Sequence, residues 1–127
     1  MNPVGWFEIY VDDMERAKEF YQKVFNCTLE KVSNVGTKSM EGFELWTFPQ
    51  TMDSYGAGGA LCKMEGFKAG GNSTLVYFSC NDCSVEETNV RELGGKVEKS
   101  KMSIGPHGFI SICVDTEGNT FGLHSMK

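Results

Sequence analysis

One carboxylate lies inside a stretch that has the pattern of a β-strand. Residues 6–11 alternate between two faces, so that Glu8 shares one face with Trp6 and Tyr10 while apolar side chains occupy the other. Acidic side chains are rarely buried unless they are paired. Desolvation between aromatic rings favours the neutral carboxyl group and raises its pKa, which is the condition that a general base requires. Glu8 is therefore the candidate base. The alternative is a structural Glu8, either paired with an arginine or a tyrosine or lying at a rim.

Two histidines and one cysteine are the other candidates for chemistry. Cys62 and His124 stand at the same place in two similar segments, residues 60–64 and 122–126. A thiol and an imidazole could form a nucleophile–base pair or hold a zinc ion weakly, and the alternative is that both are partly buried packing residues. His107 lies in a Gly-Pro-His-Gly loop, where an imidazole could act at the mouth of a pocket.

Cys80 and Cys83 form a C-x-x-C pattern at the expected start of a helix. In redox sites of this form, the helix N-terminus stabilises a thiolate. Asp82 opposes that effect, because a neighbouring carboxylate raises the pKa of a thiol. The sequence has no second C-x-x-C that would complete a zinc site. The pattern therefore favours two packing cysteines over a redox or metal site.

The first elements that position these residues are a strand, a helix N-cap and a helix. The helix is expected over residues 14–26, where apolar side chains recur at helical spacing and place Phe20 and Val24 on its buried face. Either Asp12 or Asp13 can accept hydrogen bonds from the free N–H groups of the first turn.

The second half of the chain repeats this order. Residues 75–82 alternate like the first strand and end on an acid, and residues 83–95 follow the pattern of the first helix. A repeat of about half the chain predicts two copies of one β-α-β-β-β unit and an α+β fold. Three further strands are expected in each half, over residues 28–32, 43–48 and 60–64 and over residues 96–102, 109–115 and 120–125.

Two motifs make the repeat specific. The pattern Val11-x-Asp13-x-Glu15-x-x-x-x-Phe20-Tyr21 resembles the opening of a module of the vicinal oxygen chelate (VOC) superfamily, the family of glyoxalases, bleomycin-resistance proteins and extradiol dioxygenases. Residues 115–119 resemble the turn that ends the family's second module. The resemblance implies a single domain over residues 1–127, with module one at about 3–65, a linker at 66–73 and module two at about 74–126. It also implies that the two modules form an open barrel around a cavity, with the helices on the outside.

The resemblance also places the family's metal ligands, on the first and fourth strands of each module. In this chain those positions hold Trp6, Ala60, Leu75 and Gly122. Divalent metals in such sites are held by carboxylate, imidazole or amide groups, and none of these four side chains provides one. We therefore expect no metal and no other cofactor.

The predicted function therefore depends on the side chains that are expected to face the cavity. Glu8 is the candidate catalytic residue, with His107 and His124 as weaker candidates. The expected ligand-binding residues are Trp6, Trp46, Cys62, Tyr77 and Phe109. The leading hypothesis is a glyoxalase/bleomycin-resistance-like protein that binds a small molecule without the usual metal. One alternative is a glyoxalase-like lyase or isomerase with Glu8 as base, and the other is a resistance-type protein that sequesters a drug or metabolite.

Composition limits the partners. The 127 residues carry 12 basic and 17 acidic side chains, a net charge of −5, without a basic cluster, which argues against nucleic acid and anionic membranes as partners. No signal peptide and no apolar run of the ~18 residues that a membrane helix needs are expected. Five cysteines without an export signal favour reduced thiols in the cytoplasm. The family resemblance implies a homodimer.

Overall fold

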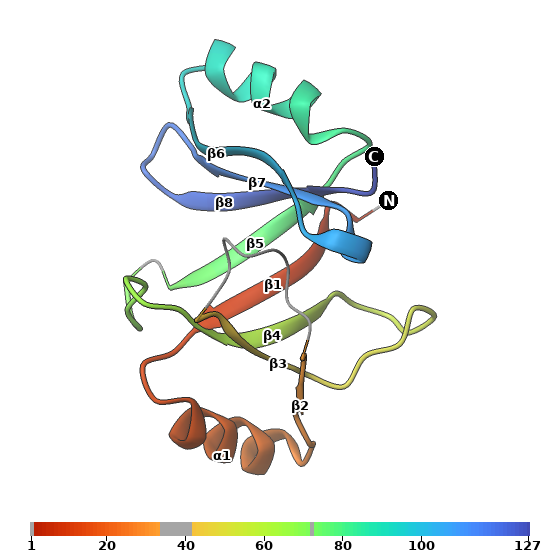
Figure 1. Ribbon diagram of the computed structural model, residues 1–127, viewed down its shortest axis with the longest axis vertical. Coiled ribbons are helices and arrows are strands. Elements are labelled where there is room, and N and C mark those ends of the chain that lie inside the picture. The colour runs from red at the N-terminus through yellow and green to blue at the C-terminus, as the bar shows by residue number, and fades with distance from the viewer. Residues whose placement is uncertain (1, 34–41, 72) are drawn as a thin grey trace. The chain divides into compact units, whose positions relative to one another are not determined.

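The computed structural model describes residues 2–33, 42–71 and 73–127. It divides into two compact units, Trp6–Thr74 and Leu75–Lys127, and the start of the chain up to Gly5 belongs to the second. Each unit has one helix beside its own strands, in the order β-α-β-β-β (Figure 1). The predicted α+β class and the repeat of one supersecondary unit are confirmed. Within the described residues, neither helix has the length and apolar character needed to cross a membrane.

The first unit contains α1 and four strands. The strands lie in the order β2-β3-β4-β1, with β1 and β4 parallel and the other neighbours antiparallel. The elements are β1 (Val4–Tyr10), α1 (Met14–Phe25), β2 (Glu30–Lys31), β3 (Glu44–Thr47) and β4 (Gly58–Lys63).

The second unit has the same arrangement, with strand order β5-β8-β7-β6 and a parallel pair formed by β5 and β8. A short 3₁₀ turn, η2, follows β6. The elements are β5 (Thr74–Ser79), α2 (Cys83–Glu92), β6 (Lys96–Ser103), η2 (Gly105–His107), β7 (Phe109–Val114) and β8 (Thr120–Ser125).

The register of the two parallel pairs is the same. Tyr10 of β1 lies opposite Cys62 of β4, and Ser79 of β5 lies opposite His124 of β8. Cys62 and His124 therefore occupy equivalent places in the two units, as the sequence repeat predicts. Because side chains alternate along a strand, this register also fixes which residues of paired strands share a face.

Each helix covers one face of its unit's strands. In the first unit the buried cluster beneath α1 consists of Val11, Met14, Leu29 and Leu61. In the second unit it consists of Cys83, Cys113 and Leu123. The opposite faces carry other side chains and are described with the site.

A single aspartate caps the start of α1, and the aspartate just before it binds a different backbone N–H. Asp13 is the N-cap, and its Oδ1 accepts a hydrogen bond from the backbone N–H of Arg16 at 3.0 Å. Asp12 instead accepts from the backbone N–H of Ala69 at 3.0 Å. Since Ser73 accepts from the N–H of Tyr10 at 2.7 Å, the segment after β4 is fastened to the end of β1 at two points.

The expected burial of Phe20 and Val24 is wrong. Their side chains are 59% and 56% exposed, whereas Met14 is 4% exposed and Ala17 and Tyr21 pack against the core. The buried stripe follows residues 14, 17 and 21, and each neighbouring position on an α-helix is turned by about 100°. Both apolar stripes have helical spacing, so periodicity alone does not distinguish the one that the strands cover.

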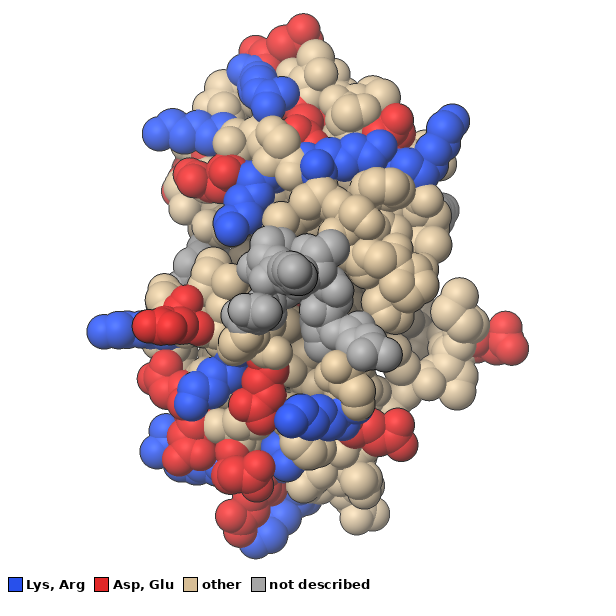
Figure 2. Space-filling view, in the orientation of Figure 1, with Lys and Arg blue, Asp and Glu red and all other residues tan. Residues whose placement is uncertain are grey.

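The surface of α1 carries charges of both signs. Lys18 pairs with Glu15 at 3.1 Å and Lys23 with Glu19 at 2.7 Å. In Figure 2 acidic and basic side chains are interspersed over α1, at the bottom of the view. The Lys23–Glu19 pair is exposed at both ends, and such pairs contribute little to stability, about 0–1 kcal/mol.

An aspartate also begins α2, and here it has a cationic partner. Asp82 is the N-cap, and its Oδ1 accepts hydrogen bonds from the Ser84 N–H at 3.0 Å and from Lys101 Nζ at 2.9 Å. The hydrogen bond from Lys101, and then those from Ser84, lower the pKa of Asp82 below its ordinary value.

We expect Met14→Ala to destabilise the fold far more than Phe20→Ala. Deleting the buried Met14 side chain should cost about 2–5 kcal/mol of unfolding free energy. Deleting the exposed Phe20 ring should change it by less than about 1 kcal/mol. Urea unfolding of both variants measures the difference. A Phe20→Ala variant that is destabilised as strongly as Met14→Ala would contradict the described seating of α1.

Asp82→Asn should remove part of the acid sensitivity of folding. A carboxylate with a lowered folded pKa stabilises the fold above its unfolded pKa of about 3.9, and this contribution is lost as pH falls. Asparagine is also a good N-cap, so the variant mainly loses the charge opposite Lys101. We expect the variant to be less stable than wild type at pH 7 and the difference to shrink from about pH 5 downward. Urea unfolding at pH 7 and pH 3 tests this, with Asp13→Asn as the control for a capping carboxylate. A difference that is the same at both pH values would contradict it.

Candidate functional site

Glu8 is buried on β1, with hydrogen bonds to both of its carboxylate oxygens. Its side chain is 7% exposed. The indole Nε1 of Trp6 donates to Oε2 at 3.1 Å, and the hydroxyl of Tyr10 donates to Oε1 at 2.8 Å. All three side chains lie on the face opposite α1, because Ile9 between them packs against the helix core. The two donors hold the carboxylate in one orientation.

Cys62, another predicted site residue, lies on the same face of the strands as this carboxylate. It is fully buried on β4, in the pair with Tyr10. Burial, and after it the charge of Glu8, raise the pKa of the Cys62 thiol well above its ordinary value. Cys62 is therefore a neutral thiol at neutral pH, which does not favour it as a nucleophile or as a metal ligand.

Aromatic rings surround Tyr10. The ring of Phe67 stacks on it with centroids 5.1 Å apart, and Phe43 approaches edge-on at 6.4 Å. Phe67 is 42% exposed, so this part of the face is accessible. Strand alternation gives a signal for Tyr10. No local signal exists for Phe67, because it lies in the predicted linker, residues 66–73.

Trp46 and Phe109 do not join this group. Trp46 packs against the core beneath α1, donates from Nε1 to Glu44 Oε1 at 3.0 Å, and has Lys18 Nζ 3.3 Å from its ring centroid. Phe109 is on the helix side of the second unit, since Ser111, two residues later on the same strand face, donates to the buried Glu87 of α2. Both aromatic residues therefore lie on helix-covered faces, and their ligand-binding roles gain no support.

Tyr77 lies on the helix-free face of the second unit and is 5% exposed. Its ring covers Gly122 on the neighbouring strand β8. A β-carbon at position 122 would lie 2.8 Å from Cγ of Tyr77, which is closer than van der Waals contact. The tyrosine ring thus fills the space that a ligating side chain at this position would need.

The residues at the family's metal-ligand positions therefore do not fit a divalent metal. Ala60 and Leu75 are buried apolar side chains, and Gly122 is covered by a ring. The nitrogen of Trp6 is an N–H donor that is committed to Glu8. Over residues 2–33, 42–71 and 73–127, no group of three His, Cys, Asp or Glu side chains could hold a metal ion.

The two histidines are in contact in the second unit, where the ring of His124 binds the backbone of His107. Nε2 of His124 on β8 lies 2.6 Å from the backbone carbonyl oxygen of His107 in η2. A carbonyl oxygen only accepts, so Nε2 carries the hydrogen. The His107 side chain itself is exposed. A thiol–imidazole pair between His124 and Cys62, which belong to different units, stays a prediction.

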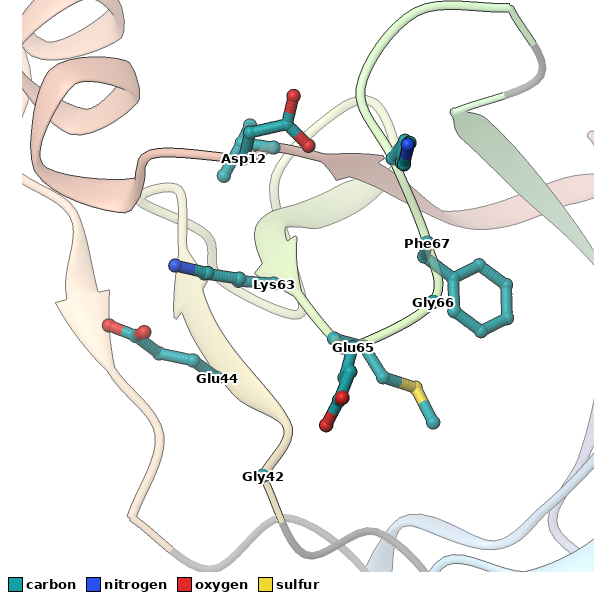
Figure 3. A pocket seen from close by; sticks show the side chains of 10 residues that line it. Asp12, Gly42, Glu44, Lys63, Glu65, Gly66 and Phe67 are labelled. Atoms are coloured by element: carbon teal, nitrogen blue, oxygen red, sulfur yellow. The ribbon is translucent and has the colours of Figure 1, made fainter.

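A hollow of about 390 Å³ opens on the first unit, beyond the ends of β1 and β4. Charged side chains dominate it, and Glu8 does not line it. In Figure 3, Lys63 and Glu44 extend to the same side, whereas the ring of Phe67 points the other way. Asp12 at its edge already accepts from Ala69. This open hollow shares Phe67 with the candidate site, but Glu8 itself does not line it.

Among solved structures, the chain matches proteins of the same fold at low sequence identity. A variant of Streptomyces coelicolor methylmalonyl-CoA epimerase, solved with 2-nitronate-propionyl-CoA, matches with a TM-score of 0.65 and 15% identity over 98% of this chain and 97% of that one. The Mycobacterium tuberculosis methylmalonyl-CoA epimerase matches with a TM-score of 0.65 and 12% identity over 98% and 88%. An uncharacterised protein from Methanosarcina mazei matches with a TM-score of 0.60 and 17% identity over 100% and 95%. At these identities the matches show a shared fold.

The family comparison covers most of the chain. No curated protein matches it. The family model described as Glyoxalase/Bleomycin resistance protein/Dioxygenase superfamily matches residues 4–123. The match spans both β-α-β-β-β units and agrees with the fold of the solved structures. This chain therefore belongs to the glyoxalase/bleomycin resistance protein/dioxygenase superfamily, the VOC superfamily.

Proposed function

We propose that this protein binds a small organic molecule at the face of β1 that carries Glu8, and that it does so without the metal of the VOC superfamily. The observation that carries the proposal is the buried Glu8 carboxylate, oriented by Trp6 and Tyr10. A buried carboxylate that two donors hold in one orientation gives a ligand a defined point of attachment in an apolar wall. The four non-ligating residues at the metal positions support the metal-free form.

The chemistry of this face indicates the class of ligand. An ionised carboxylate only accepts hydrogen bonds, so it selects a ligand group that donates one, such as an amine or a hydroxyl. Phe67 is partly exposed and stacks on the buried ring of Tyr10, so it provides flat apolar surface that solvent can reach. We therefore expect a small, largely planar molecule with a donor or cationic group. Sequestration of a drug or metabolite is one form of this binding function.

A second candidate is an isomerase with Glu8 as the base. Epimerisation beside a carbonyl requires that a base remove a proton from carbon and that the proton return on the other side. A buried carboxylate suits that role, and two of the structural matches are methylmalonyl-CoA epimerases. The resulting enolate also needs a donor or cation to stabilise it. Trp6 and Tyr10 both donate to Glu8, so the described face supports binding better than turnover.

Glu8→Gln should weaken ligand binding without unfolding the protein. The amide oxygen can still accept from Trp6, and the amide nitrogen can donate to the hydroxyl of Tyr10, which both donates and accepts. A lost charge-assisted hydrogen bond is worth about 1.5–3 kcal/mol, so we expect the Kd of a ligand found by a thermal-shift screen to rise about 10- to 100-fold. Calorimetric titration of wild type and variant measures the change.

The chain provides a matched control for that experiment. Glu44 also accepts a hydrogen bond from a tryptophan two residues away, but on the helix-covered face. Glu44→Gln should leave the Kd unchanged, and an equal effect of both substitutions would contradict the proposed site. For the isomerase, methylmalonyl-CoA is incubated with each protein in D₂O. Deuterium uptake that is present in wild type and lost in Glu8→Gln would replace the binding proposal by the enzymatic one.

Removing metal should have no effect. We expect elemental analysis of the purified protein to find far less than one equivalent of Ni, Zn, Fe or Mn per chain. Since a metal that binds only the folded state raises the Tm, dialysis against a chelator should leave the Tm and ligand binding unchanged. A stoichiometric metal whose removal lowers the Tm would contradict the metal-free form of the proposal.

A further inference from the structure

Two cysteine sulfurs lie close together where α2 begins. Cys80 Sγ and Cys83 Sγ are 4.0 Å apart, and all five cysteines, which lie in the described residues, are free thiols. A disulfide needs a sulfur–sulfur distance of about 2.05 Å, so the two atoms must approach by about 2 Å. Cys80 is only partly buried, precedes the helix, and donates from its thiol to the carbonyl oxygen of His124 at 3.4 Å. Cys83 is fully buried at the first helical position.

Both cysteines are held by β8. The backbone N–H of Cys80 donates to the carbonyl oxygen of His124 at 2.9 Å. The N–H of Cys83 donates to Ser125 Oγ at 3.2 Å, and the Ser125 hydroxyl donates to Cys83 Sγ at 3.2 Å. These contacts fix the two backbone positions and the inner sulfur, so that the thiols stay adjacent.

A carboxylate lies beside the outer thiol. Glu86 follows Cys83 by about one helical turn, and its Oε2 is buried without a hydrogen-bond partner within the described part of the chain. Burial, and then the neighbouring Cys83 and Glu86, raise the pKa of the Cys80 thiol to about 12. Cys80 is thus protonated at neutral pH and needs a proton acceptor before it can react, because the thiolate is the nucleophile. Glu86 is therefore the carboxylate that influences this thiol, and its Oε2 has no hydrogen-bond partner in the described residues that would prevent it from taking the proton.

We propose that Cys80 and Cys83 form an oxidisable dithiol site, in which Cys80 meets the oxidant, Cys83 resolves it and Glu86 accepts the Cys80 proton. With hydrogen peroxide as oxidant, the Cys80 sulfur attacks one peroxide oxygen and the O–O bond breaks. Cys80 becomes a sulfenic acid, and the departing hydroxide takes the proton from Glu86 and leaves as water. Cys83 then attacks the Cys80 sulfur, and its proton leaves with the sulfenic hydroxyl as a second water.

The overall reaction converts two thiols and one hydrogen peroxide into one disulfide and two water molecules. The sulfur pair is oxidised by two electrons and the peroxide is reduced by two. The site is distinct from the face around Glu8 and does not depend on the function proposed above. Its raised thiol pKa makes it a slow site, suited to sustained oxidant rather than to rapid turnover.

The experiment oxidises the full chain with excess hydrogen peroxide and then counts its thiols in denaturant. We expect the count to fall from the five of the sequence to three, with the loss of two hydrogen atoms from the intact mass. Peptide mapping should join Cys80 to Cys83, and a reductant should restore all thiols. Cys80→Ser and Cys83→Ser should each prevent the disulfide, and Cys27→Ser, which changes a thiol outside the site, should not.

The role of Glu86 has its own readout. Glu86→Gln should slow disulfide formation by about tenfold or more, the lower range of general-base effects, without changing the product. Glu92→Gln, an exposed position on the same helix, should leave the rate unchanged. Equal rates in wild type and Glu86→Gln would overturn the role of Glu86. A count that stays at five, or a disulfide between Cys83 and Cys113, would overturn the site. If the buried Cys83→Ser variant fails to fold, the partly buried Cys80→Ser variant alone still tests whether the disulfide requires this pair of cysteines.

Discussion

The parallel pairing of the first and last strand of each unit is the constraint on which the rest of the structure depends. It sets Tyr10 against Cys62 and Ser79 against His124, and strand alternation then assigns every neighbour to one of two faces. A slip by one residue would carry Glu8 to the helix-covered face, into a core built mainly of aliphatic and aromatic side chains. The position of the candidate site therefore follows from strand register more than from any single contact.

The two units keep this frame and differ in chemistry. The position of Glu8 in the first unit corresponds to that of Tyr77 in the second, and the two have Ala60 and Gly122 as their partners. In the first unit a methyl group leaves room beside a carboxylate. In the second, a glycine without a side chain lets a tyrosine ring lie flat on its backbone. A repeated backbone thus carries a polar site in one half and an aromatic packing residue in the other.

The two β-α-β-β-β units can be predicted from the sequence. Which helix and loop side chains are buried against the strands cannot. Strand alternation, the acidic caps and the internal repeat predict both units, because each is a local property of period two or 3.6. Periodicity does not predict the exposure of Phe20, because two adjacent apolar stripes on α1 have the same period. Only tertiary contacts determine which stripe is buried. Trp46 was assigned to a pocket by residue type, while its strand parity places it beneath the helix. Phe67 reaches Tyr10 through a segment with no periodic pattern at all.

A pair of similar contacts shows why environment and not motif defines the site. Trp6 with Glu8 and Trp46 with Glu44 are both tryptophan–glutamate pairs two residues apart on a strand, with N–H to oxygen distances of 3.1 Å and 3.0 Å. Glu44 remains partly exposed, where solvent screens its charge. Glu8 is buried, where the lower local dielectric strengthens every interaction of the carboxylate and makes each one costly to lose. The same two residue types therefore give a partly exposed carboxylate on the helix-covered face and a buried carboxylate at the candidate binding site. The difference is the strand face on which the register puts them.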